Sequence, residues 1–136
     1  MPSPLPALRI VSFGYGHRPA PTADITLDLR RILRNPHQDP ALRELTGLDE
    51  VVLQHVLTTP GAIPLVTATA AAAAGLVTAG VPLTVAVGCV GGRHRAVGAA
   101  RAVAAMAGPL LKLAGAAAAL EHRDVHQPLL PPAAHR

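Results

Sequence analysis

The residues best suited to chemistry lie between Gly88 and Arg95, where the sequence reads Gly-Cys-Val-Gly-Gly-Arg-His-Arg. The apolar, β-branched run Val81–Val87 precedes this segment, and an alanine-rich stretch follows it. This order predicts a buried strand, a glycine-rich turn and a helix beginning at Arg95. Such a turn brings backbone N–H groups, the positive end of a helix dipole and cationic side chains to one point. We therefore expect an anion site, with Gly91 and Gly92 around a phosphate group that Arg95 grips.

The familiar phosphate-binding motifs do not account for this segment. A Walker A loop requires Gly-Lys-Ser/Thr and a dinucleotide fold requires Gly-x-Gly-x-x-Gly, and neither pattern occurs between Gly88 and Arg95. The alternative is a tight strand-to-helix turn whose basic side chains are solvated. We adopt the anion site because the glycines, the helix start and the cations all agree on it.

Cys89 and Arg95 are separated by five residues, which is the spacing found in cysteine-dependent phosphatases. In those enzymes a thiolate attacks phosphorus while loop amides and the arginine hold the phosphate oxygens. Here Gly88 stands where such enzymes have a histidine, and no aspartate can be assigned as the general acid. We favour a packing role for Cys89, as a small buried residue, and keep the phosphatase as an alternative.

The apolar half of the 136 residues consists almost wholly of Ala, Val and Leu, with one Phe, one Tyr and no Trp. This length suffices for one domain, but small side chains bury little area each, so we expect a thin, closely packed core. Such a core favours an oligomer in which a further face is covered. The uncharged stretch Gly61–Gly92 is long enough to span a bilayer, but it divides into a helix and a strand around Ala79–Pro82. We therefore expect no membrane contact.

The net charge is +4, and only 15% of the residues are charged. This balance attracts anions, but the sequence has neither a basic stripe nor the stacking aromatics of a strong nucleic-acid binder. The single cysteine excludes an internal disulfide framework and fits a reducing compartment. No signal-peptide pattern occurs at the start of the sequence, so the expected location is the cytoplasm.

Apolar patterning predicts alternating strands and helices. The predicted strands are Ala7–Phe13, Asp24–Leu29 and Val81–Val87, and the predicted helices are Leu48–Thr58, Ala62–Ala79 and Arg95–Ala107, the last ended by Gly108-Pro109. Asn35–Gly47 reads as an ordered loop with helical turns at most, and Leu110–Leu120 as a short helix or a last strand. The alternation predicts an α/β fold, a small layered sheet with flanking helices, whose ligand lies outside the carboxyl ends of the strands.

Proline content divides the sequence further. Residues 1–6 are expected to form a disordered N-terminus, residues 7–126 one domain, and residues 127–136 a proline-rich tail. The link from Gly14 to Asp24 is short for a helical crossover between parallel strands, so the sequence does not fix the strand order.

Four blocks in series make the sequence resemble the C-terminal domain of the RapZ family, RNase adapter proteins that are also described as nucleotide-binding. The blocks are Val-Ser-Phe-Gly-Tyr-Gly at Val11–Gly16, Ala-Asp-Ile-Thr-Leu-Asp-Leu-Arg at Ala23–Arg30, Asn-Pro-His at Asn35–His37 with Leu42-Arg43 and Thr46–Asp49, and Thr84–Arg95 with His122–Val125 downstream. The resemblance extends from about residue 10 to residue 125. The Gly-Cys-x-Gly-Gly-x-His-Arg element is its most distinctive part.

The resemblance implies a fold like a subdomain of phosphofructokinase and a pocket for an amino-sugar phosphate, glucosamine 6-phosphate in the best-known members. It implies that His37 contacts the ligand and that Asp28 and Arg30 belong to a motif beside the pocket. The residues that match the phosphate-side motif are Cys89, Val90, Gly91, His94 and Arg95.

Three departures from the family pattern narrow this expectation. The family's N-terminal domain with its Walker A loop has no counterpart in the sequence, which excludes ATP binding by that route. Val90 stands where the family usually has a hydroxyl residue, which removes one hydrogen bond to the ligand. The family's basic, RNA-binding tail is replaced by Gln127–Arg136, so RNA or a ribonuclease becomes a doubtful partner.

His122 and His126 are four residues apart and would share one face if the segment were helical. No cysteine or carboxylate pattern accompanies them, so we expect two surface histidines and no metal. The sequence as a whole predicts a regulatory rather than catalytic module, without a cofactor, that senses a phosphorylated metabolite. His94 and Arg95 would neutralise the phosphate, and the alternatives are a Cys89 phosphatase and an RNA-binding adapter domain.

Overall fold

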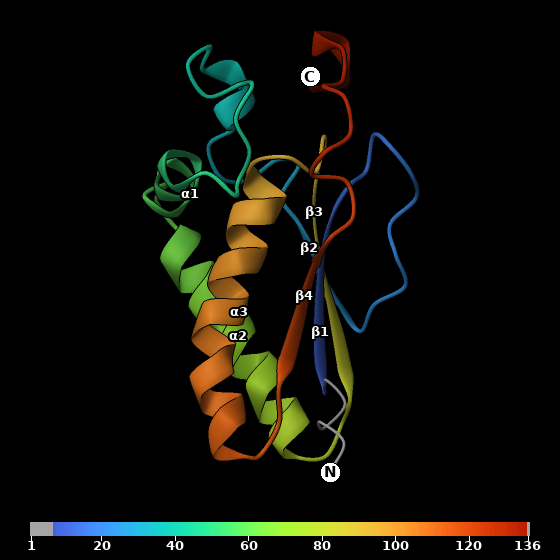
Figure 1. Cartoon of the computed structure of the whole chain (residues 1–136), viewed down its shortest axis with the longest axis vertical. Coiled ribbons are helices and arrows are strands. Elements are labelled where there is room, and N and C mark those ends of the chain that lie inside the picture. Colours follow the sequence, from blue (N-terminus) through green and yellow to red (C-terminus); the bar gives the residue numbers. More distant parts are fainter. Residues whose placement is uncertain (1–6, 136) are drawn as a thin grey trace.

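The computed structural model describes residues 7–135, and the disordered start expected at residues 1–6 lies outside them. Four parallel strands form one sheet in the order β2-β3-β1-β4, with helices packed on one face (Figure 1). The elements are β1 (Leu8–Gly14), β2 (Ile25–Asp28), α1 (Glu50–Leu57), α2 (Ala62–Thr78), β3 (Leu83–Cys89), α3 (Arg95–Leu113) and β4 (Ala118–His122), with 3₁₀ turns η1 (Pro36–Gln38) and η2 (Pro132–His135). The predicted α/β layered fold is therefore confirmed.

Both faces of the two central strands are buried. Alternate residues point to opposite faces, so Ile10 and Val85 join the core beneath the helices while Val11 and Phe13 face the other way. Alanines dominate the helix surfaces in this core, which lets α2 and α3 lie close to the sheet. The opposite face is covered by the loop of residues 15–24, visible to the right of the sheet in Figure 1.

That loop also explains the strand order. It leaves β1, crosses the face of β3 and enters β2, so the two strands that follow each other in sequence are not neighbours in the sheet. A parallel connection usually needs a helix to cover the distance. Here an extended chain is enough, because polar contacts described below anchor the loop.

One predicted boundary is wrong. The helix α3 continues through Gly108 and Pro109 and ends at Leu113, where Gly115 has a φ of +71° in the turn that follows. Proline removes one helical hydrogen bond. Leu111 is fully buried, and this burial offsets the loss. The segment Leu110–Leu120 therefore begins as the last turn of α3 and only its end belongs to β4.

The remaining boundaries lie within about two residues of the predicted ones, and β3 begins and ends two residues later than Val81–Val87. Among the described residues, α3 is long and apolar enough to cross a membrane, and α1 with α2 would be so only as one span, despite a bend of 94°. Half of α3 is buried inside the domain, and core helices pass the same test. Length and composition are therefore only weak evidence for a membrane span.

Candidate functional site

A pocket opens at the carboxyl ends of the strands, where ligands bind in open α/β sheets. About 320 Å³ of space lies within the pocket and its opening to solvent. The loops that follow β2, β3 and β4 supply its lining: Asn35, His37, Cys89, Gly91, Arg93, His94, Arg95 and Gln127–Leu130. In Figure 1 the segment 29–47 and the C-terminal segment both extend beyond the strand ends.

The glycines of the turn are required by packing against β1. Gly92 has a φ of +66°, and a Cβ there would lie 2.5 Å from the backbone nitrogen of Gly14. A Cβ on Gly14 would in turn lie 2.6 Å from the carbonyl carbon of Gly91. The two glycine positions thus let the turn rest directly on the end of β1. Gly92 is buried and does not line the pocket, whereas Gly91 does.

Cys89 has the small-residue role that the sequence favoured, although it also reaches the pocket wall. It is 4% exposed, and its Sγ accepts a hydrogen bond from the backbone N–H of Ala96 at 3.4 Å. The thiol thus satisfies one of the N–H groups that the first turn of α3 leaves without a helical partner. None of the described residues that line the pocket is Asp or Glu, so no carboxylate is placed as a general acid for a phosphatase.

Arg93 and His94 hold the neighbouring loop, so these two basic side chains are not simply solvated. The Nε of Arg93 donates to the carbonyl of Leu45 at 2.9 Å, and its Nη2 donates to the carbonyl of Glu44. The His94 Nε2 lies 3.1 Å from the carbonyl oxygen of Arg43. Because a carbonyl only accepts, this nitrogen carries the proton. These contacts fix the segment that leads from η1 to α1.

Arg95 is a buried charged group without a carboxylate partner among the described residues. It is 4% exposed, and its Nη1 donates to the carbonyls of Leu29, Arg30 and Ile32 at 2.7, 3.4 and 3.3 Å. Its buried Nε has no hydrogen-bond partner, and no carboxylate within residues 7–135 forms an ion pair with it. Burial lowers the pKa of Arg95, yet a guanidinium remains charged in proteins. A buried cation with an unfilled donor therefore borders the pocket.

Two histidine rings lie close together at the same wall. The rings of His37 and His94 have centroids 6.4 Å apart at 63°. Burial lowers the pKa of His94 to about 4, and burial followed by the charges of Arg43 and Arg93 lowers the pKa of His37. Both rings are therefore neutral at pH 7. Positive charge at this wall therefore comes from the arginines, and the expectation that His94 helps to neutralise a phosphate stays a prediction.

Four of the expected residues lie outside the pocket lining: Asp28, Arg30, Val90 and Gly92. Asp28 accepts two bonds from the guanidinium of Arg30, at 3.0 and 2.7 Å, and this hydrogen bonding holds the pKa of the carboxyl below its ordinary value. The same guanidinium lies 3.7 Å above the ring of Tyr15. The carbonyl of Val90 accepts a hydrogen bond from Gly16. These residues shape the rim of the strand ends, while Cys89, Gly91 and the buried cation line the pocket.

Sequence reasoning missed two parts of the lining, namely Asn35 and the C-terminal Gln127–Leu130, and it expected Arg93 only as one of the cations of the turn. Asn35 caps η1, its Oδ1 accepting the N–H of His37 at 3.1 Å, and the Asn-Pro pair is a sequence signal for this turn. The C-terminal segment carries only a pair of leucines between prolines as a signal.

The expected pair of surface histidines is half wrong. His122 lies on β4 and is partly buried, with its Nδ1 2.6 Å from the Oγ of the buried Ser12, whereas His126 is exposed in the following turn. They share no helix face. Within the described part of the chain, no group of three metal-ligating side chains comes together.

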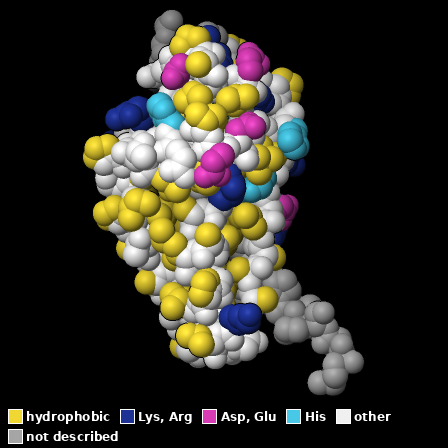
Figure 2. All heavy atoms as spheres, turned by 60° about the vertical axis from the view of Figure 1, so that its left-hand side comes forward, with side chains coloured by type: hydrophobic (Ala, Val, Ile, Leu, Met, Phe, Trp, Pro, Cys, Tyr) yellow, Lys and Arg dark blue, Asp and Glu magenta, His cyan; other side chains and the backbone are white. Residues whose placement is uncertain are grey.

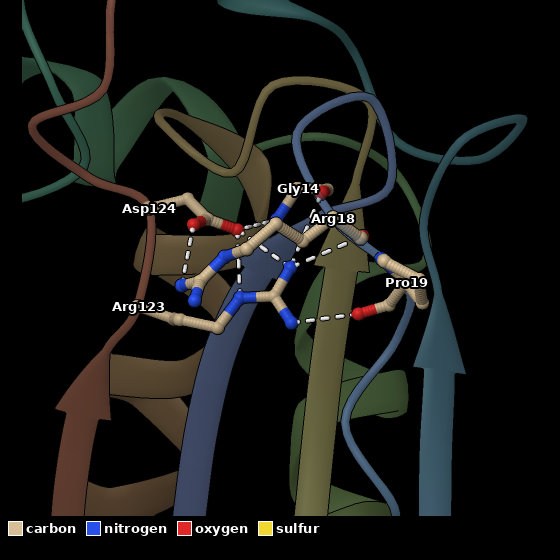
Figure 3. A network of polar contacts seen from close by, with 5 residues as sticks. All are labelled: Gly14, Arg18, Pro19, Arg123 and Asp124. Atoms are coloured by element: carbon tan, nitrogen blue, oxygen red, sulfur yellow. Dashed lines mark hydrogen bonds and ion pairs between the residues drawn. The ribbon is translucent and has the colours of Figure 1, made fainter.

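Arg123 and Asp124 anchor the loop that crosses the sheet (Figure 3). The carboxylate of Asp124 is fully buried and accepts the N–H of Gly14 at 2.8 Å, and it pairs with Arg123 at 2.8 Å and Arg18 at 3.3 Å. Arg123 also donates to the carbonyl of Pro19 at 2.7 Å. These hydrogen bonds and ion pairs hold the pKa of Asp124 below its ordinary value despite its burial. The network therefore joins the ends of β1 and β4 to residues 15–24.

Fold and pocket together define a small parallel α/β domain with a glycine-rich, arginine-bearing turn at the carboxyl ends of its strands. Residues 6–126 match the model of the RapZ C-terminal domain, and the chain belongs to that family. This membership covers nearly the whole of the described domain, and it supports a regulatory rather than catalytic role.

The chain is similar to curated bacterial proteins that are named nucleotide-binding proteins. It is 44% identical over 127 residues to one from Thermus thermophilus, and this alignment covers 88% of the chain and 43% of the relative. It is 38% identical over 126 residues to one of Rhodospirillum rubrum and 42% identical over 122 residues to one of Salinispora tropica, covering 89% and 85% of this chain and 38% of each relative. The chain thus spans about two fifths of the length of these relatives.

Proposed function

We propose that the domain is a regulatory module that binds a small phosphate monoester, an amino-sugar phosphate such as glucosamine 6-phosphate, in the pocket beyond the carboxyl ends of the strands. The observation that carries this proposal is the buried guanidinium of Arg95, which has no carboxylate partner among the described residues and an unpartnered Nε. Burying a charge without a counter-ion is costly, and an anionic ligand removes that cost.

The chemistry of the neighbouring groups favours phosphate among anions. A guanidinium binds two phosphate oxygens with parallel hydrogen bonds, and Arg93 adds a second positive charge at the same wall. Gly91 offers backbone without a side chain, and the start of α3 directs its positive dipole end to this region. His37, on the loop after β2, would contact the sugar end.

The neutral histidine gives this proposal a second feature. His94 uses its Nε2–H on the carbonyl of Arg43, so in the neutral ring Nδ1 has a lone pair and no proton. A phosphate oxygen next to that nitrogen would favour protonation, because the ring then donates a charge-assisted hydrogen bond. Binding of the ester is therefore expected to raise the pKa of His94.

Isothermal titration calorimetry with three probes tests the proposal: glucosamine 6-phosphate, glucosamine and inorganic phosphate. We expect the ester to bind and glucosamine to give no heat, because the phosphate supplies the counter-ion for Arg95. Release of a chromophore from an aryl phosphate, abolished by Cys89→Ser, would instead favour the phosphatase. Binding of neither phosphate probe would contradict the proposal.

A further inference from the structure

We propose that residues Gln127–Leu130, here called the strap, open and close the pocket and make it select phosphate esters over inorganic phosphate. The selectivity rests on the proposed function, whereas the opening can be measured without a ligand. The strap follows the turn after β4 and contributes four consecutive residues to the pocket lining. It thereby supplies much of the wall that does not come from the turn after β3.

Side-chain packing holds the strap in place. Pro128, Leu129 and Leu130 make no hydrogen bond to any other described residue, and the nearest backbone bond joins the N–H of Gln127 to the carbonyl of Asp124 at 3.1 Å. Leu129 and Leu130 are half-buried. A segment with few buried contacts and no backbone ladder opens at low free-energy cost, while the rest of the domain stays folded.

Leu130 is the latch of the strap. A Cβ built on Gly16 would lie 2.4 Å from the Cδ1 of Leu130, so the leucine packs directly over this glycine and would have to shift for any larger residue. Gly16 also donates its N–H to the carbonyl of Val90, directly after Cys89. The latch therefore ties the strap to the loop after β1, beside the turn that carries the proposed phosphate site.

The two walls of the pocket differ in chemistry. Arg93, His94 and Arg95 form a polar wall, and the strap presents the apolar side chains of Pro128, Leu129 and Leu130. Inorganic phosphate satisfies the polar wall and leaves the apolar wall in water. An ester also places its carbon skeleton against the strap, so its binding gains from burial that the free ion lacks.

The sole cysteine of the chain reports strap opening directly. Cys89 lines the pocket at 4% exposure, so iodoacetamide reaches it only when the pocket opens. We expect Leu130→Ser to speed alkylation about tenfold, because it weakens the packing that closes the strap. Gly16→Ala forces the Leu130 side chain to shift and is expected to act in the same direction. Leu113→Ser, at an 88% exposed position, is the control and keeps the wild-type rate.

The urea dependence of the alkylation rate separates strap opening from unfolding. Local opening exposes little surface, so the rate is expected to change little at low urea, whereas global unfolding makes it rise steeply. Equal alkylation rates in the wild type, Leu130→Ser and Gly16→Ala would overturn the proposal that the strap closes the pocket. A steep urea dependence in all three proteins would overturn it as well.

Calorimetry then tests the selectivity. We expect Leu130→Ser to weaken binding of glucosamine 6-phosphate about tenfold and to leave that of inorganic phosphate unchanged. Equal losses for both probes would contradict selection by the strap. If the wild type binds neither probe, the proposed function and the selectivity fail together, and the alkylation rates still decide whether the strap opens.

Discussion

The guanidinium of Arg95 combines a nitrogen that binds backbone carbonyls with a nitrogen that has no partner. Its Nη1 donates to the carbonyls of Leu29 and Ile32, while its buried Nε has no hydrogen-bond partner. Leu33 directly follows these carbonyls, and its φ of +64° is rare for a bulky residue and costs free energy. A ligand that engages this guanidinium therefore acts on a side chain that also holds the loop leading to His37.

The buried His94 makes stability depend on pH. Its folded-state pKa of about 4 lies below the ordinary value of 6.5, so the unfolded chain takes up its proton first as the pH falls. Stability from this group is complete above pH 6.5 and declines toward pH 4, by about 2 kcal/mol between pH 7 and pH 5. Urea unfolding of the wild type and of His94→Gln measures it, and the variant is expected to lose about 2 kcal/mol less over that interval.

His126→Gln is the matched control, because His126 is exposed in the turn after β4. Its pH dependence is expected to equal that of the wild type. An unchanged dependence in His94→Gln would contradict the buried, neutral state of His94.

At the scale of elements, the turn after β3 and the helix α2 contain glycines with opposite expected effects. Gly92→Ala forces a Cβ against the backbone of β1 at a φ of +66° and is expected to destabilise the domain by about 3 kcal/mol. Gly75 lies exposed on α2 with nothing near its missing Cβ. Gly75→Ala is expected to stabilise the domain by about 0.5–1 kcal/mol, because alanine favours the helix. Chemical denaturation measures both, and equal effects would contradict the packing of the turn on β1.

The loop of residues 15–24 depends on the Asp124 network (Figure 3). Asp124→Asn leaves Arg123 without its buried counter-ion and is expected to cost about 3 kcal/mol. Glu121→Gln is the matched control, because its ion pair with Arg9 is about half exposed on both sides and contributes less than about 1 kcal/mol. Hydrogen exchange of the loop amides is expected to accelerate in the Asp124 variant only. Unchanged exchange would show that the network does not anchor the loop.

Sequence patterns predicted most elements because their apolar periodicity is a local property. The end of α3 was not predictable in this way. A proline such as Pro109 normally ends a helix, and the helix continues past it here because Leu111 is buried against the rest of the domain, which local sequence does not reveal. The strand order was left open for the same reason, because the contacts of Asp124 with Gly14 and Arg18 join residues about a hundred positions apart.

The location of the site was predictable, but the contacts of its individual side chains were less so. A strand, glycines and a helix start placed the turn at the strand ends, and Cys89, Gly91 and Arg95 do line the pocket. The roles of the cations were missed, because hydrogen bonds to the carbonyls of a distant loop leave no sequence pattern. The strap was missed because an apolar pair between prolines reads as a tail.

On the scale of the whole molecule, most charged side chains on the helix face lie toward one end of the long axis (Figure 2). Figure 2 shows charged and histidine side chains gathered toward the pocket end and hydrophobic side chains over the rest of the helix face. Exposed apolar residues on the helices include Ile63, Leu76 and Leu113. An oligomer that covers such residues stays a prediction from the small core.

The most direct test of the account is the calorimetric titration of glucosamine 6-phosphate into the wild type and into Arg95→Lys. Lysine keeps the charge but has neither Nε–H nor the planar fork, so we expect affinity to fall at least about tenfold. Arg31→Ala, at an exposed position outside the pocket lining, is the control and keeps the wild-type affinity. Wild-type binding that Arg95→Lys leaves unchanged, or no binding by the wild type, would contradict the assignment of the pocket to a phosphate ester.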